Sequence, residues 1–231
     1  MAKWPLIATI SAALLGAGVL VAAQTGEAQG TGDTDHSQAE QDAAASSEAM
    51  AARAAIADDP IAPKFEPADY DVTIISYADY QCPYCRKVHP ELERLAKEDG
   101  KVRIVYRDWP IFGAASEEAA RAAIASQWQG KHAEFNDQLM RIEGRLDSAK
   151  IRAAADRAGV DWARLQRDLE AHEGDIDAVI GRTGMQAAQM GLQGTPALLI
   201  GPYFVPGAIN YSGLTKGVAL AREFNAKHAG R

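Results

Sequence analysis

Cys82 and Cys85 are the two cysteines of the chain, and only Pro83 and Tyr84 separate them. On a helix this spacing places both side chains on one face, close enough to form a disulfide. A cysteine at a helix N-terminus has a lowered pKa, because unpaired N–H groups and the helix dipole stabilise its thiolate. We therefore expect Cys82 to form a mixed disulfide with a partner. We expect Cys85, as the more buried of the pair, to resolve it.

Two other chemistries stay open for this pair. A structural disulfide would close a very short loop, for which the entropic stabilisation is smaller than for a long one. A metal site could recruit His89, but the sequence supplies no second Cys-x-x-Cys pair and no histidine cluster to complete it. The position expected for Cys82, at the start of a helix, favours redox chemistry over both alternatives.

The segments around the pair are typical of a strand, a helix and a second strand. Asp71 to Ala78 is apolar and β-branched without alternation, as in a strand buried on both faces. Pro83 is typical of a first helical residue, and Gly100 ends the helix that runs to Lys97. Lys101 to Arg107 alternates polar and apolar residues, which predicts a second strand. The short connections predict a βαβ unit with parallel strands.

Beyond this unit the pattern is first helical and then returns to strands. Ser116 to Met190 contains no β-branched run and is interrupted by glycines, which predicts several helices of ordinary length. Pro196 to Gly201 predicts a short buried strand, with Tyr203 to Val205 as its hairpin partner. Leu214 to Phe224 predicts a closing amphipathic helix. The sequence thus indicates an α/β protein.

The N-terminal residues have the pattern of an export signal. Lys3 is followed by an uncharged apolar stretch from Leu6 to Ala22, and Val21-Ala22-Ala23 offers small residues for cleavage. We expect residues 1–23 to be a signal peptide. The alternative is an N-terminal membrane anchor formed by residues 6–23, since the stretch approaches the length that spans a bilayer. Either alternative places the rest of the chain outside the cytoplasm.

Residues 24–68 are expected to form a linker. Gln24 to Asp59 is poor in aromatic residues and rich in Ala, Gln and Ser. Ser37 to Ala57 favours helix by its alanine content, but few large apolar residues are available for a helix–helix seam. The segment is therefore either a solvated linker or a helix that assembles a homo-oligomer. Pro60, Pro63 and Pro67 are expected to separate it from the compact domain.

Charge and composition exclude two classes of protein. The net charge is −7 with a pI near 5.3, which argues against nucleic acid as a partner, because phosphate backbones are bound by clustered Lys and Arg. A hydrophobic content of 47% excludes wholesale disorder.

The residues around the cysteines resemble the thioredoxin-fold DsbA family of extracytoplasmic thiol–disulfide oxidoreductases. The stretch Tyr77 to Arg86 is similar to the active-site segment of that family, and Gly194-Thr195-Pro196-Ala197 is similar to its second signature. Asp108 to Gly113 resembles the entry into the inserted helical domain of the family, and Val205 to Ala208 fits a later strand end. The motifs occur in matching order over about Asp69 to Lys227. Within the family the chain looks closest to the ScsC-like branch.

This resemblance implies the fold and several site residues. It implies a thioredoxin fold in two parts, residues 69–113 and 192–231, with a helical domain inserted at 114–191. It implies a cis bond between Thr195 and Pro196, facing the cysteines, so that Thr195 can pair with an extended substrate segment. Pro83 and Tyr84 belong to the same active-site loop.

Two residues near the cysteines are candidate modulators. Many thioredoxin-fold enzymes carry a buried acid six residues before the first cysteine, where this chain has Ser76. Asp79 is acidic but closer, and as a preferred capping residue it is expected to serve in the turn rather than in proton transfer. His89 is expected to be a partly exposed helix residue with a weak influence on Cys82. Because Tyr84 offers no cation to the thiolate, we expect a potential nearer to that of glutaredoxins than to that of strongly oxidising DsbA proteins.

The expected function is dithiol oxidation in the periplasm through Cys82 and Cys85, with no cofactor besides their redox-active disulfide and no metal. The resemblance implies unfolded or reduced exported proteins as substrates and a membrane redox partner of DsbB or DsbD type. One alternative is a disulfide isomerase or reductase of the oligomeric ScsC type, assembled through residues 37–57. Others are a chaperone-like protein and a copper-binding protein.

Overall fold

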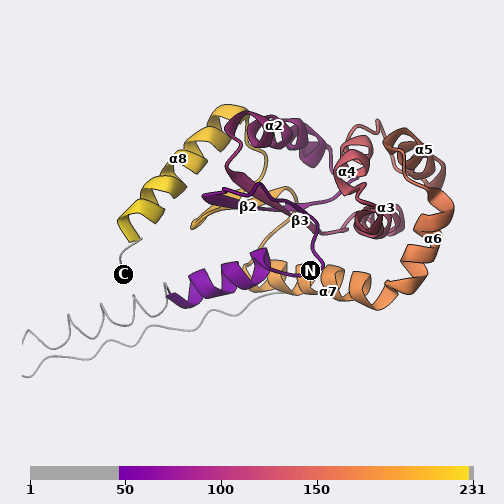
Figure 1. The fold of residues 1–231 in the computed structure, drawn as a ribbon, viewed down its shortest axis with the longest axis horizontal. Helices are drawn as coiled ribbons and strands as arrows, with labels where there is room; N and C mark the ends of the chain where they lie inside the picture. The colour runs from indigo at the N-terminus through magenta and orange to yellow at the C-terminus, as the bar shows by residue number, and fades with distance from the viewer. Residues whose placement is uncertain (1–46, 229–231) are drawn as a thin grey trace, which may run out of the picture. The chain divides into compact units, whose positions relative to one another are not determined.

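The computed structural model describes residues 47–228, in which a five-stranded mixed sheet lies between helices on its two faces (Figure 1). The strand order in the sheet is β1-β3-β2-β4-β5. The strands are β1 (Lys64–Phe65), β2 (Val72–Ala78), β3 (Val102–Asp108), β4 (Ala197–Ile200) and β5 (Tyr203–Pro206). The helices after the first strand are α2 (Pro83–Asp99), α3 (Ala114–Ala125), the 3-10 turn η1 (Ser126–Gln129), α4 (His132–Met140), α5 (Ser148–Ala158), α6 (Trp162–Ala171), α7 (Glu173–Gln189) and α8 (Tyr211–His228).

The predicted βαβ unit is formed by β2, α2 and β3. The two strands are parallel, with Val72 paired with Val102 and Ala78 paired with Asp108. Helix α2 starts at Pro83 and ends before Gly100, which adopts a left-handed conformation with φ +69°. A residue with a side chain is disfavoured at this φ, and the glycine therefore gives the helix a clean stop. The ends of β2 and β3 consequently lie at the same edge of the sheet, next to the start of α2.

Helices α3 to α7 lie between β3 and β4 in the chain, and α3 to α6 gather beyond one end of the sheet (Figure 1). The chain then returns to the sheet as β4, which pairs antiparallel with β2 so that Tyr77 lies opposite Ala197. Strand β5 completes the predicted hairpin. Because β4 runs antiparallel to β2, its first residue lies beside the last residues of β2.

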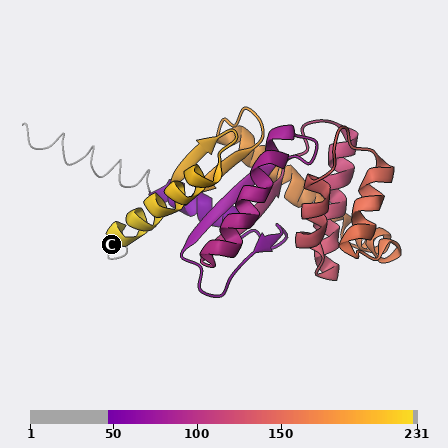
Figure 2. The same ribbon diagram turned by 90° about the horizontal axis from the view of Figure 1, so that it is seen from above.

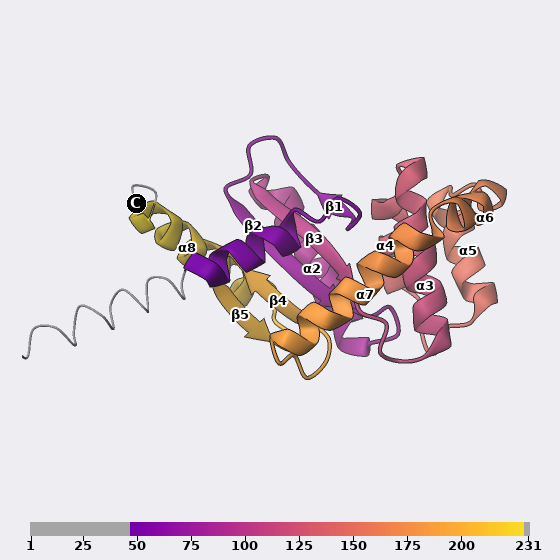
Figure 3. The ribbon, with the colours of Figure 1, turned by 90° about the horizontal axis from the view of Figure 1, so that it is seen from below.

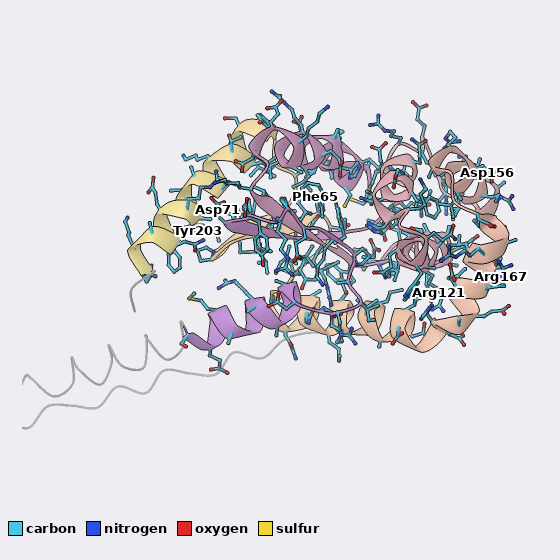
Figure 4. The ribbon with its side chains drawn as sticks, in the orientation of Figure 1. Phe65, Asp71, Arg121, Asp156, Arg167 and Tyr203 are labelled. Atoms are coloured by element: carbon cyan, nitrogen blue, oxygen red, sulfur yellow. The ribbon has the colours of Figure 1, made fainter. Side chains whose placement is uncertain are left out.

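Two helices cover one face of the sheet. Helices α2 and α8 lie side by side on this face (Figure 2), and together they enclose an apolar core with Ile74, Leu95 and Leu214. Arg222 of α8 pairs with Asp71 at 2.8 Å and with Asp99 at 2.6 Å. Asp71 lies at the end of the sheet beside α8, away from helices α3 to α6 (Figure 4). These pairs join α8 to the start of β2 and the end of α2.

Strand β3 is buried along its whole length, although its sequence alternates between polar and apolar residues. Its two arginines are buried because acidic residues from other segments pair with them. Arg103 pairs with Asp58 at 2.9 Å and with Glu66 at 2.8 Å. Arg107 is fully buried and pairs with the equally buried Asp59 at 2.9 Å. Strand β3 is therefore buried on both faces, and not half-exposed as the alternation of polar and apolar residues suggests.

The prediction that prolines separate the N-terminal segment from the compact domain is wrong for residues 56–65. Residues 47–57 are helical, and this helix crosses the face of the sheet opposite α2, where α7 also lies (Figure 3). Ile56 and Ala62 are buried in the main core. Lys64–Phe65 forms strand β1, which pairs antiparallel with β3. Asp59 also pairs with Arg182 of α7 at 2.8 Å, so this segment is bound by charge as well as by burial.

The predicted signal peptide or anchor, the residues 24–46 of the predicted linker and the 37–46 part of the predicted oligomerisation helix lie outside the described residues. None of the helices within residues 47–228 is long and apolar enough to cross a membrane.

Candidate active site

The cysteine pair lies where β2 passes into α2. The chain leaves β2 at Ala78 and makes a turn in which the Cys82 N–H donates to the Asp79 carbonyl at 3.0 Å. Cys82 has extended backbone angles and caps the helix, and Pro83 occupies its first turn. Proline fits there because its missing N–H would have no helical partner. The local sequence thus places Cys82 at the helix N-terminus, as predicted.

A second loop, from the far end of the chain, lies against Cys82. The Thr195–Pro196 peptide bond is cis, as the resemblance implied. The pairing of Tyr77 with Ala197 carries this loop to the end of β2. There the Cys82 Sγ lies 3.2 Å from the Thr195 carbonyl oxygen. Thr195 and Cys82 are 113 residues apart in the chain, and the pairing of β4 with β2 brings their segments together.

The two thiols have opposite acidities. The pKa of Cys82 is lowered to about 5, first because the Cys85 thiol donates a hydrogen bond to its sulfur. The Thr195 side chain and the backbone N–H groups of Tyr84 and Cys85 also stabilise the thiolate, whereas burial opposes the shift. The pKa of Cys85 is raised far above its ordinary value, because the thiol donates that hydrogen bond and because it is buried. At neutral pH the pair therefore holds one thiolate, on Cys82, and one proton, on Cys85. Cys82 is the nucleophile and leaving group of the pair.

Exposed area does not distinguish the two cysteines, since Cys82 is 1% exposed and Cys85 is 2% exposed. Cys85 nevertheless lies deeper below the surface than Cys82, as expected. The Thr195 loop lies against the Cys82 sulfur and covers part of it. Tyr84, between them, is 58% exposed and marks the solvent side of the site. The different acidities arise first from the hydrogen bond between the two thiols, and burial adds to the raised pKa of Cys85.

Asp79 holds the active-site turn to the helical insertion. Its carboxylate accepts hydrogen bonds from the Gln81 N–H at 2.7 Å and the Ser116 hydroxyl at 2.7 Å. It also accepts from the backbone N–H groups of Ile111 at 2.7 Å and Phe112 at 3.1 Å. Three of these four donors come from beyond the end of β3. The structure therefore places Asp79 in the turn role expected for it, and extends that role to the start of α3.

Three residues near the site were not identified from the sequence. Gln81 donates from Nε2 to the Phe112 carbonyl at 3.1 Å and accepts at Oε1 from the Leu146 N–H at 3.0 Å. Ile111 and Phe112 are exposed apolar residues held beside the turn by Asp79. The sequence signal that could have indicated these two is their position after Asp108-Trp109-Pro110, in the segment that resembles the entry into the inserted helical domain.

His89 is buried rather than partly exposed. It is 5% exposed, because α4 packs over this turn of α2 and places Asp137 Oδ1 3.4 Å from its Nε2. Burial lowers the pKa of the imidazole. His89 and Cys85 line the same small cavity, and Cys82 does not line it. Within this part of the site His89 therefore lies nearer to Cys85 than the sequence suggested. In residues 47–228, no cluster of three or more His, Cys, Asp or Glu side chains is placed to hold a metal ion.

Comparison with known proteins gives one family. A family model for thioredoxin matches residues 68–219. A thioredoxin-like oxidoreductase from Silicibacter pomeroyi DSS-3 is 38% identical, with a TM-score of 0.70 over 74% of this chain and 98% of that one. The catalytic domain of Proteus mirabilis ScsC has the same fold, with a TM-score of 0.69 and 24% identity over 76% of this chain and 98% of that domain.

Among curated proteins the chain is similar to part of a longer protein. It is 27% identical over 157 residues to the Na⁺/H⁺ antiporter NhaA 1 of Salinispora arenicola. The match covers 67% of this chain but spans only 24% of the length of that relative.

Proposed function

The chain belongs to the thioredoxin family, and from this premise we propose that it is an extracytoplasmic thiol–disulfide oxidoreductase that exchanges disulfides with proteins through Cys82 and Cys85. The observation that carries the proposal is the asymmetry of the pair. The Cys82 thiolate faces the Thr195 loop, and its proton-bearing partner lies one helical turn further on. A structural disulfide or a metal site would not require two thiols of such different acidity.

The proposed oxidation proceeds in two exchanges. In the first, a substrate thiolate attacks Cys82 Sγ of the Cys82–Cys85 disulfide, and Cys85 leaves and takes up a proton. In the second, another substrate thiolate attacks the substrate sulfur of the mixed disulfide, and Cys82 leaves as a stable thiolate. The substrate loses two electrons and gains a disulfide, and the enzyme becomes the dithiol. The low pKa of Cys82 makes it a good leaving group in the second exchange.

The same low pKa supports oxidation over reduction as the direction. Stabilising one thiolate stabilises the dithiol form and makes the disulfide more oxidising. Tyr84 supplies no cation, yet the hydrogen bonds of Cys85, Thr195 and the helix start lower the pKa of Cys82 to about 5 without one. Isomerisation or reduction is the alternative, through a homo-oligomer assembled by residues 37–57.

The surroundings of the site support unfolded or reduced exported proteins as substrates. Tyr84, Ile111 and Phe112 are exposed apolar side chains on segments joined at the active-site turn. Unfolded chains expose apolar residues that such a surface can bind. Main-chain pairing of an extended substrate with Thr195 would hold a cysteine beside Cys82. The signal-like residues 1–23 support a periplasmic location, and a membrane protein of DsbB or DsbD type would restore the redox state.

Two measurements test the proposal. The purified protein is expected to oxidise a dithiol peptide and to reduce insulin, and Cys82→Ser is expected to abolish both activities. Activity of Cys82→Ser equal to that of the wild type in both assays would refute the proposed chemistry. The direction is tested in cells by trapping the thiols with an alkylating label. A mainly oxidised pool supports the oxidase, and a mainly reduced pool supports the isomerase.

A further inference from the structure

A small cavity lies beside Cys85, and Pro196 of the Thr195 loop also contributes to its walls. Its volume is about 20 Å³, enough to hold one water molecule. Cys85 and His89 from α2, Asn136 from α4 and Asp108 from the end of β3 contribute to its walls. The Cys85 thiol and the Asp108 carboxyl group therefore border the same cavity.

Asp108 has no cation paired with it among residues 47–228. It is buried, and its Oδ2 atom has no hydrogen-bond partner in that part of the chain. Its neighbour Arg107 pairs instead with Asp59. Burial raises the pKa of Asp108 to about 7, the Tyr80 hydroxyl and Arg107 lower it in part, and the charge of Asp79 raises it. The carboxyl therefore changes its protonation state in the neutral range.

Cys85 requires such a group in either direction of exchange. Its raised pKa keeps it a thiol, and a thiol is a poor nucleophile. When Cys85 attacks a mixed disulfide it must lose a proton, and when it leaves the Cys82–Cys85 disulfide it must gain one. Because Cys85 is only 2% exposed, direct exchange of its proton with bulk water is hindered.

We propose that Asp108 exchanges this proton with Cys85 through a water molecule in the cavity. The proposal rests on the proposed function. In resolution, the Asp108 carboxylate accepts the Cys85 proton, the Cys85 sulfur bonds to Cys82 Sγ, and the partner leaves as a thiolate. In oxidation of a substrate the steps reverse, and the protonated Asp108 returns its proton to the departing Cys85 sulfur. No other reactant is needed, because the proton lost by one group is gained by the other.

The other titratable groups around Asp108 are poorer proton acceptors for this role. Burial lowers the pKa of His89, and it lowers that of His132 on α4 to about 3. Tyr80 and Tyr106 have pKa values raised by burial and stay protonated. A proton acceptor works best when its pKa lies near the working pH. Asp79 is occupied by four hydrogen-bond donors, and Asp108 is the acid left for this exchange.

The test uses the reduced full-length protein and dithiobis(nitrobenzoate) in a stopped-flow mixer. Cys82 first attacks the reagent and releases one coloured thiolate, and Cys85 then attacks the adduct and releases a second. In the wild type, the rate of the second release is expected to rise with pH around about 7. Asp108→Asn is expected to lose this rise and to slow the second release by about 100-fold near pH 8, with the first release unchanged. Asp137→Asn, which removes a carboxylate outside the cavity, is expected to retain the wild-type profile.

The outcomes separate this proposal from the proposed function. Without a first release, or with a first release that survives Cys82→Ser, the proposed function itself fails. If both releases occur and Asp108→Asn has the wild-type pH profile, the role of Asp108 is overturned. It is also overturned if His89→Gln, and not Asp108→Asn, removes the rise. Should Asp108→Asn not fold, carbon NMR of the reduced wild type decides: an aspartate carboxyl titrating near 7 supports the proposal, and titration of all of them below about pH 5 contradicts it.

Discussion

The Cys85 thiol is the hydrogen-bond donor on which the Cys82 thiolate depends most, and Cys85→Ala removes it. In the wild type the pKa of Cys82 is about 5. A hydrogen bond to a charged acceptor contributes roughly 1.5–3 kcal/mol, and one pKa unit corresponds to about 1.4 kcal/mol. Loss of the donor is therefore expected to raise the pKa of Cys82 by roughly 1–2 units, to about 6–7. The Thr195 and backbone contacts remain and keep the pKa below that of a free cysteine.

The assay is the ultraviolet absorbance of the thiolate, followed in the reduced protein as the pH is changed. Cys85→Ala leaves one thiol, so the titration has a single midpoint. Cys85→Ser is the matched control, because its hydroxyl keeps a donor at the same position, and its midpoint is expected closer to the wild-type value. If folded Cys85→Ala titrates at the wild-type midpoint, hydrogen bonding by Cys85 is not the cause of the low pKa.

Three further predictions concern buried acids. Asp59→Ala leaves Arg107 without its buried partner and removes the ion pair with Arg182. The substitution is expected to lower the free energy of unfolding, measured by urea denaturation, by about 3–5 kcal/mol. The ion pairs lower the pKa of Asp59, so this stabilisation is expected to be present above the unfolded-state pKa and to fall as the pH drops below it. Asp79→Ala leaves three backbone N–H groups and a hydroxyl without an acceptor, and is expected to cost roughly 2–4 kcal/mol by the same assay. Asp108 has a raised pKa, so wild-type stability is expected to fall as the pH rises from about 4 to about 7, and Asp108→Asn is expected to remove this fall.

Each of these has a contradicting result. Unfolding of Asp59→Ala within about 0.5 kcal/mol of the wild type would show that the N-terminal segment does not depend on its ion pairs. Asp79→Ala with unchanged stability would remove the turn role of that carboxylate. An identical pH dependence of unfolding in wild type and Asp108→Asn would show that Asp108 titrates normally. Glu117→Ala, at an exposed acid on α3, is the control for all three.

The elements that follow from local patterns could be predicted from the sequence. The strand ending at Ala78, the helix between Pro83 and Gly100 and the hairpin near Tyr203 are all found where apolar runs and glycine or proline signals placed them. The site at the junction of the first two follows from the same signals. The cis bond before Pro196 came from the family resemblance, since an X–Pro bond has no local signal that fixes its isomer.

What depends on distant contacts could not be predicted. Strand β1 has only two residues, in the stretch between Pro63 and Pro67, and it forms only because β3 offers a free edge. Asp59 is buried because Arg107 and Arg182, 48 and 123 residues away, meet it there. His89 is buried by α4, and Asp108 and Cys85 line one cavity only because α2, α4 and β3 come together there. The pattern of residues along the chain shows their types but not these long-range contacts.

The central claim, that Cys82 exchanges disulfides with protein substrates while Cys85 resolves the intermediate, is tested most directly by trapping that intermediate. Cys85→Ala in its reduced form is incubated with a disulfide-containing unfolded protein, and the products are analysed by mass spectrometry without reductant. The account predicts a covalent adduct at Cys82 that dithiothreitol releases and that wild type does not accumulate. The absence of an adduct at Cys82, with folded protein and an exposed substrate disulfide, would contradict it.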